Sequence, residues 1–204
     1  MIMKQVVLGT QRFKIVLLCG FLLICLSGFG QVKYEREHRI KKSQFPVSAR
    51  SFFENNVDEA KKIRYYREVD SNLVTYTVRF RKDRLYYGLQ FNRQSVLQHI
   101  EFSIKEVDIP EESLQQIKSY LDNNFNKYNV RRISQQYPVS SEQPVAISMR
   151  NAFQNLIIES IRYELMFRGK KEAKGVDYEA LFGSDGSFIN IRKSLPPNYD
   201  HVLY

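Results

Sequence analysis

Residues 73–92 read LVTYTVRFRKDRLYYGLQFN, and they carry the clearest pattern in the chain. Apolar and polar side chains alternate on both sides of a short polar turn at Lys82-Asp83. Because successive side chains of a β-strand point to opposite faces of a sheet, this alternation predicts two antiparallel strands joined as a hairpin. We expect the apolar face to be covered by other elements and the polar face to be open to a partner. The apolar positions are Val74, Tyr76, Val78, Phe80, Leu85, Tyr87, Leu89 and Phe91.

Two other segments have a helical period instead. Apolar residues between 114 and 125 recur at intervals of three and four, which predicts a helix that begins after Pro110. Glu111 and Glu112 follow this proline, at the end of a helix where negative charge is favoured. A shorter helix is predicted at about Val47–Asn56. The periodic residues of the first helix are Leu114, Ile117, Leu121 and Phe125.

An internal repeat relates the two halves of the chain. Residues 40–46, IKKSQFP, match residues 104–110, IKEVDIP, at an offset of 64, and each motif leads into a predicted helix. Later landmarks keep the same order at larger offsets: Tyr76 with Tyr163, and Tyr87 with Tyr178. The sequence therefore predicts two units, residues 31–106 and 107–204, each with a strand, a helix and three further strands. The predicted fold class is α+β, an antiparallel sheet with helices packed on one face.

Residues 138–158 are an insertion that lengthens the second unit. A polar Ser-Ser-Glu-Gln-Pro stretch is followed by apolar residues at helical spacing, which predicts a third helix. This helix would either pack on the domain or form an amphipathic arm that docks onto a partner. Its apolar residues are Val145, Met149, Ala152, Phe153 and Leu156.

Residues 1–30 have the three regions of a secretory signal peptide. Basic residues come first, residues 15–26 form an unbroken apolar run, and small residues lead up to Gly30. We expect cleavage between Gly30 and Gln31, and a periplasmic or secreted protein. The alternatives are a transmembrane anchor, which needs about 20 apolar residues, and a lipoprotein attached at Cys25. The basic residues are Lys4, Arg12 and Lys14.

The remaining residues, 31–204, exclude several classes of protein. They contain no cysteine, which excludes a disulfide framework, a thiol enzyme and an iron–sulfur protein. They hold 28 basic and 22 acidic side chains, so their net charge is +6, compared with +9 for the full chain. His38, His99 and His201 show no metal-binding spacing, and phosphate-loop, dinucleotide and nucleophile-elbow motifs are absent. We therefore predict a protein without catalytic residues, metal or cofactor, and not an enzyme.

Four segments together resemble a known family. They are the charged opening Tyr34–Lys42, the stretches Lys62–Tyr66 and Arg131–Tyr137, and the turn Ser184–Gly186. With the leader, the tandem order and the strand pattern, they look like the exported PepSY-like proteins of Bacteroidetes, also described as beta-lactamase-inhibitor-like. The resemblance covers nearly all of residues 33–195. It implies a tandem α+β fold in the bacterial periplasm or cell envelope, and a non-catalytic binding or inhibitory role.

The polar face of the predicted sheet is the candidate binding surface. Arginine and aromatic side chains on this face are of the types that dominate protein interfaces. We therefore expect it to bind an envelope or secreted protein or peptide, and the family resemblance implies that it does so in the manner of a protein or peptidase inhibitor. The sequence leaves the oligomeric state open. The predicted partner-binding residues are Thr75, Thr77, Arg79, Tyr86, Gln90, His99, Glu101, Arg162 and Glu164.

The excess of positive charge lies in the first unit. Residues 41–106 hold 13 basic and 8 acidic side chains, whereas residues 107–204 hold 12 of each. Such a basic face would suit nucleic acid in the cytosol, but the leader argues against nucleic acid as the partner. An anionic glycan or a membrane surface is the alternative partner, and solvated protection of a sheet edge is the other interpretation of these charges. The basic residues concerned are Arg64, Arg67, Arg79, Arg81, Lys82 and Arg84.

Overall fold

The computed structural model describes residues 34–70, 73–172 and 174–194, which belong to one compact unit. The predicted signal peptide, Cys25, the cleavage site between Gly30 and Gln31, and His201 lie outside the described residues. Within the described ranges, no helix is both long enough and apolar enough to cross a membrane.

A nine-stranded antiparallel sheet organises the described residues, and its strand order follows the chain order from β1 to β9. Strands β5 and β6 pair directly, so the two predicted units share one continuous sheet. The predicted boundary between residues 106 and 107 falls in the connection between these strands, and it stays a prediction. The strands are β1 (Tyr34–Ile40), β2 (Lys61–Asp70), β3 (Leu73–Lys82), β4 (Leu85–Asn92), β5 (Leu97–Ile104), β6 (Lys127–Pro138), β7 (Arg162–Lys170), β8 (Gly175–Gly183) and β9 (Phe188–Ser194).

In the described residues, three α-helices accompany the sheet: α2 (Val47–Asn56), α3 (Glu111–Asn124) and α4 (Val145–Phe153). Each helix begins directly after a proline, and the φ angles of Pro46, Pro110 and Pro144 are −54°, −52° and −59°. Proline has this φ in any context, so each helix start is set before packing contributes. The predicted helices in both units are confirmed, and the α+β class is confirmed with them.

The repeated seven-residue motif has the same local structure in both copies. Each copy forms one 3-10 turn, Lys42–Gln44 and Glu106–Asp108. In the first copy the Gln44 side chain accepts a hydrogen bond from the Lys41 N–H over 2.8 Å, and in the second copy Asp108 accepts one from the Lys105 N–H over 2.8 Å. The next side chain is buried in both copies, Phe45 and Ile109. A glutamine and an aspartate therefore perform one structural role at equivalent positions.

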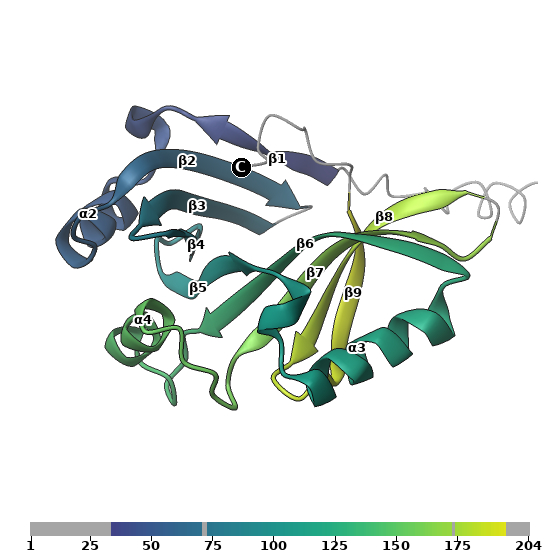
Figure 1. Ribbon diagram of the computed structural model, residues 1–204. Helices are drawn as coiled ribbons and strands as arrows, with labels where there is room; N and C mark the ends of the chain where they lie inside the picture. Colours follow the sequence, from purple (N-terminus) through teal and green to yellow (C-terminus); the bar gives the residue numbers. More distant parts are fainter. Residues whose placement is uncertain (1–33, 71–72, 173, 195–204) are drawn as a thin grey trace, which may run out of the picture. The chain divides into compact units, whose positions relative to one another are not determined.

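The three helices cover the apolar face of the sheet, and Figure 1 shows them on the outer side of the curved sheet. Phe53 of α2, Ile117 of α3 and Met149 of α4 belong to the same buried core as the strand residues Phe80 and Phe102. Aromatic rings stack along this core; the Phe80 and Tyr87 ring centroids are 5.7 Å apart. The predicted apolar face is thereby confirmed.

Helix α4, the predicted insertion, packs on the domain beside β5 and β6. Ser148 Oγ donates a hydrogen bond to the Pro138 carbonyl over 2.9 Å, and the Phe153 ring lies 5.3 Å from the Tyr87 ring in an edge contact. The alternative of a free docking arm is therefore wrong. Leu156 does not continue the helical face as predicted, because the helix ends at Phe153 and Asn155 takes a positive φ of 51°.

Candidate functional site

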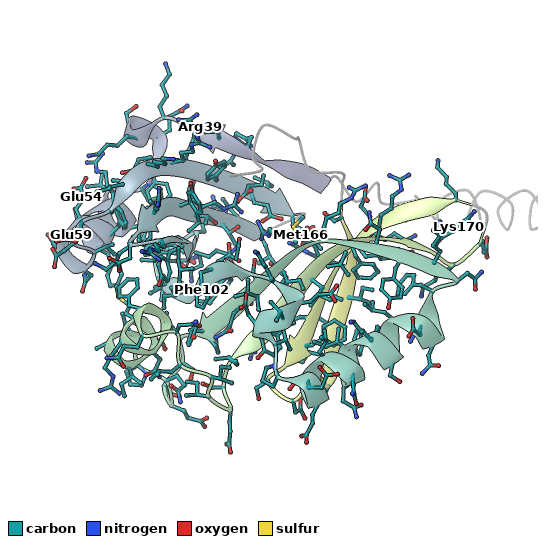
Figure 2. The ribbon with its side chains drawn as sticks, in the orientation of Figure 1. Arg39, Glu54, Glu59, Phe102, Met166 and Lys170 are labelled. Atoms are coloured by element: carbon teal, nitrogen blue, oxygen red, sulfur yellow. The ribbon has the colours of Figure 1, made fainter. Side chains whose placement is uncertain are left out.

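The strand register places all nine predicted partner-binding residues on one face of the sheet. Arg79 lies opposite Gly88, Gly88 opposite Glu101, Glu101 opposite Gln136, and Gln136 opposite Arg162. The remaining predicted residues lie an even number of positions from one of these, so their side chains point to the same face. In Figure 2, Met166 is labelled on this face, and Phe102 is labelled on the opposite, apolar face. We call this surface the polar face.

The polar face is curled inward, not flat. Arg192 on β9 donates hydrogen bonds to Asp70 over 3.0 Å and to Glu68 over 3.2 Å, and both acceptors lie on β2. These strands are seven positions apart in the sheet, a distance of about 33 Å in a flat sheet, which two side chains cannot span. The sheet therefore bends until β9 faces β2 across the polar side, as the facing groups of strands in Figure 1 show.

This curvature corrects the expectation of an open face. Thr77 is 4% exposed and Glu101 is 8% exposed, so the middle of the polar face is buried although its residues are polar. Arg79 is held by Glu37 of β1, with 2.9 Å between Nη1 and Oε2, and its guanidinium lies 4.7 Å from the centre of the Tyr66 ring. These side chains contact one another across the neighbouring strands β1, β2 and β3, which the pattern of a single strand cannot reveal.

Charged side chains form a belt around the inside of the curl. Arg132 on β6 lies 3.7 Å from Glu101 on β5 and 3.5 Å from Glu164 on β7. Arg192 Nε donates to Glu179 on β8 over 2.6 Å, and its other nitrogens reach back to β2. Through Arg132, the ionic belt thus links β5 to β7. Through Arg192 on β9, it links β8 to β2. It consists of Glu37, Glu68, Asp70, Arg79, Glu101, Arg132, Glu164, Glu179 and Arg192.

Gly88 gives Glu101 the room it needs in this belt. A Cβ atom at Gly88 would lie 2.9 Å from Glu101 Oε1 and 3.0 Å from its Cγ, closer than real Cβ contacts. The carboxylate can therefore lie across β4, between Arg79 and Arg132. This close approach of a neighbouring side chain explains why a glycine lies inside β4, a strand that pairs on both sides.

The belt has six carboxylates and three arginines, and this imbalance shifts the pKa values of its members. Burial, together with repulsion from Glu101 and Glu179, raises the pKa of Glu164 to about 7, against the attraction of Arg132 and Arg192. Burial also raises the pKa of Glu68, with Arg192 opposing the shift. Burial would raise the pKa of Glu101 too, but the attraction of Arg132, then Arg79 and His99, outweighs it and the pKa is lowered.

A cavity of about 980 Å³ opens at one end of the polar face. Four predicted residues line it, Thr75, Gln90, His99 and Arg162, together with residues from the loops at 139–143 and 159–161. Leu73 on β3 and Ile189 on β9 form opposite walls, so the curl of the sheet creates the cavity. Burial lowers the pKa of His99, with the attraction of Glu101 opposing the shift.

The lining of the cavity is rich in carboxamides and balanced in charge. Arg93 and Arg162 are matched by Glu142 and Glu159, and the described lining residues include no Phe, Tyr or Trp. Each carboxamide offers both hydrogen-bond donors and an acceptor. The carboxamide residues are Gln90, Asn92, Gln94, Gln98, Gln136 and Gln143.

Solved structures from Bacteroides are similar to this chain. A DUF2874 family protein from Bacteroides ovatus is 11% identical, with a TM-score of 0.48 over 73% of this chain and 87% of its own. A BLIP-like protein from Bacteroides fragilis is 11% identical, with a TM-score of 0.47 over 77% and 92%. A putative periplasmic protein from Bacteroides eggerthii is 12% identical, with a TM-score of 0.48 over 73% and 88%. No protein-family model and no curated protein sequence matches the chain, and the PepSY-like assignment stays a prediction.

The structure divides the predicted residues among four places. Thr75, Gln90, His99 and Arg162 line the cavity, Arg79, Glu101 and Glu164 belong to the ionic belt, Thr77 is buried between them, and Tyr86 lies beyond the belt opposite Arg81. Sequence reasoning found Gln90 but missed the other five carboxamides of the lining. Their signal was present, since Asn92, Gln94 and Gln98 cluster around the turn between β4 and β5, but loops commonly have such a composition.

No metal centre accompanies these groups in the part of the chain that the structure describes, where no three His, Asp or Glu side chains gather in an arrangement that could hold an ion. His38 on β1 and His99 on β5 lie on different strands. The expectation that the protein is not an enzyme stays a prediction.

Proposed function

We propose that this protein is an exported, non-catalytic binding protein that receives a polypeptide segment of a partner in the cavity of its polar face. The observation that carries this proposal is the lining of that cavity, which combines six carboxamides with equal numbers of acidic and basic side chains. The leader of residues 1–30 supports export.

The hydrogen-bond donors and acceptors of a polypeptide main chain match those of this lining. Each peptide unit carries one donor and one acceptor, and both must be paired when the unit leaves water. Carboxamides supply both partners at once, whereas a strongly charged ligand would find no net charge to oppose it. Apolar residues on the cavity walls, among them Leu73, Val139, Ile161 and Ile189, would contact the side chains of the segment.

The experiment selects peptides from a displayed random library on the purified protein and measures the affinity of the selected peptides by calorimetry. Gln90→Leu removes a carboxamide from the cavity at nearly constant volume, and we expect it to weaken binding at least tenfold. Gln115→Leu, at an exposed carboxamide on α3 that does not line the cavity, is the matched control and should bind as the unaltered protein does.

Two results contradict the proposal. Selection that yields only strongly charged peptides would show that the balanced lining does not determine the ligand. Equal affinity of the Gln90→Leu and Gln115→Leu variants would place the binding site elsewhere.

A further inference from the structure

Four basic side chains gather at the end of the polar face opposite to the cavity. Lys61 on β2 lies opposite Arg81 on β3, and Arg64 on β2 lies opposite Arg79. Arg39 on the edge strand β1 lies opposite Tyr66, two residues from Arg64. Directly opposed Cβ atoms are about 5 Å apart and diagonal ones about 7–8 Å, so long side chains here can reach one common group. We call Arg39, Lys61, Arg64 and Arg81 the basic corner.

The basic corner lacks counter-ions within the described residues. None of the ion pairs found in the described residues involves a member of the basic corner. The adjacent Arg79 is already paired with Glu37. Other basic residues of the first half have partners or lie apart: Lys82 donates to the Asp58 carbonyl over 3.0 Å, and Arg84 is exposed in a turn. Like charges on adjacent strands repel each other, so an unpaired group of four is unfavourable without an anion.

Protection of a sheet edge does not account for this group. Arg81 lies on the inner strand β3, where it pairs with Lys61 of β2 on one side and with Tyr86 of β4 on the other, and its side chain is half-buried. The Nε atom of Arg81 is shielded from water and has no hydrogen-bond acceptor in the described structure. A guanidinium with such an unpaired N–H gains a hydrogen bond if it turns toward an acceptor on a bound ligand.

A bulge in β2 brings Lys61 and Arg64 to the same face. They are three residues apart, an odd spacing that would place them on opposite faces of a regular strand. The register shifts between Lys61 and Arg64, and Lys62 takes a positive φ of 53° there. Bulges of this kind re-aim side chains.

We propose that the basic corner binds a tetrahedral oxyanion with two negative charges, a phosphate or sulfate group. Four positive charges exceed what one carboxylate neutralises, whereas a tetrahedral dianion offers several acceptor oxygens to converging guanidinium groups. Along β3 the corner is six residues, about 20 Å, from the cavity residue Thr75. The site is therefore independent of the proposed cavity function, and either can fail without the other.

The test titrates the purified protein with inorganic phosphate at pH 7 and follows the arginine Nε–H signals by NMR. We expect saturable shifts, and an affinity for acetate at equal ionic strength at least tenfold weaker. The double variant Arg64→Gln/Arg81→Gln should lose at least tenfold in phosphate affinity. Removal of two exposed charges on other elements, in Arg150→Gln/Lys193→Gln, is the matched control and should change it less than twofold.

Vesicles of phosphatidic acid, whose headgroup is a phosphate monoester, distinguish the two sources of the same chemistry. Binding to inorganic phosphate without vesicle binding supports a small free oxyanion, and vesicle binding lost in the double variant supports a phosphate carried on a lipid headgroup. Arg64→Lys keeps the charge but not the planar fork, and we expect it to fold normally and to bind at least threefold more weakly. The proposal is overturned if neither probe binds, if acetate equals phosphate, or if the double variant equals its control.

Discussion

Glu164 shows how a single residue depends on the whole polar face. It is a strand residue that faces Ser134 across the β6–β7 pairing, and its own strand pattern predicts a polar, outward side chain. In the folded protein it faces Glu101 from β5, Arg132 from β6, Glu179 from β8 and Arg192 from β9. Burial and two neighbouring carboxylates thus oppose its charge more strongly than two arginines favour it.

The raised pKa of Glu164 predicts a loss of stability toward neutral pH. In the folded state Glu164 keeps its carboxyl proton up to a pKa of about 7, compared with an ordinary 4.5. The contribution of this proton to the free energy of unfolding is therefore complete below pH 4.5 and disappears as the pH rises through 7. Glu164→Gln keeps the shape and removes the titration. We expect the variant to lose less unfolding free energy than the unaltered protein between pH 4.5 and 8, measured by urea denaturation.

The control for this prediction is Glu172→Gln, which alters an exposed carboxylate at the end of β7. It should retain the full pH dependence of the unaltered protein. If Glu164→Gln and Glu172→Gln give parallel curves, the proton that Glu164 holds does not contribute to folding.

At the scale of elements, α4 tests whether the insertion is part of the core. Met149 is 6% exposed in the core, whereas Ile147 on the same helix is 38% exposed. Met149→Ala should lower the unfolding free energy by about 2–5 kcal/mol, because it removes buried methylene groups and leaves a cavity. Ile147→Ala should lower it by less than about 1 kcal/mol. Urea denaturation measures both, and equal effects of the two changes would contradict the packing of α4.

Elements were predictable from the sequence where a local signal determined them. The helix at Val47–Asn56 has the expected bounds, and each helix follows a proline. The alternation in residues 73–92 assigned the faces of β3 and β4 correctly. Leu156 was misplaced because the end of α4 depends on the positive φ of Asn155, for which the apolar spacing contains no signal.

At the scale of the whole molecule, the curl of the sheet was beyond the reach of a sequence pattern. Register shifts occur in five of the eight strand pairings, and each bulge adds local twist. Twist accumulates across nine strands until β9 meets β2. The candidate site residues could be assigned to a face, but the cavity could not be predicted, because its walls, Leu73 and Ile189, meet only through this curvature.

Arg192 is the residue on which the closed curl depends. Arg192→Gln leaves Glu68, Asp70 and Glu179 without their shared cation, so we expect β9 to separate from β2 at neutral pH. Amide hydrogen exchange in β9 should accelerate, and the unfolding free energy should fall by on the order of 1 kcal/mol, as for a partly exposed ion-pair network.

Lys193→Gln is the matched control, since it removes a neighbouring exposed charge that takes no part in the ionic belt. Exchange rates in β9 should stay unchanged in this variant. Equal exchange in the Arg192→Gln and Lys193→Gln proteins would show that the sheet keeps its curvature without the belt.

The agreement between strand order and chain order has a consequence for folding. Every strand pairs with the next strand along the chain, so the sheet can grow one strand at a time from short-range contacts, which favours rapid folding. The bonds from Arg192 to Asp70 and Glu68, in contrast, join residues 122 and 124 positions apart. During synthesis or export from the N-terminal end, the apolar core can therefore begin to form early. The ionic belt is completed only when β9 pairs with β8, so the polar face is the last part of the described structure to close.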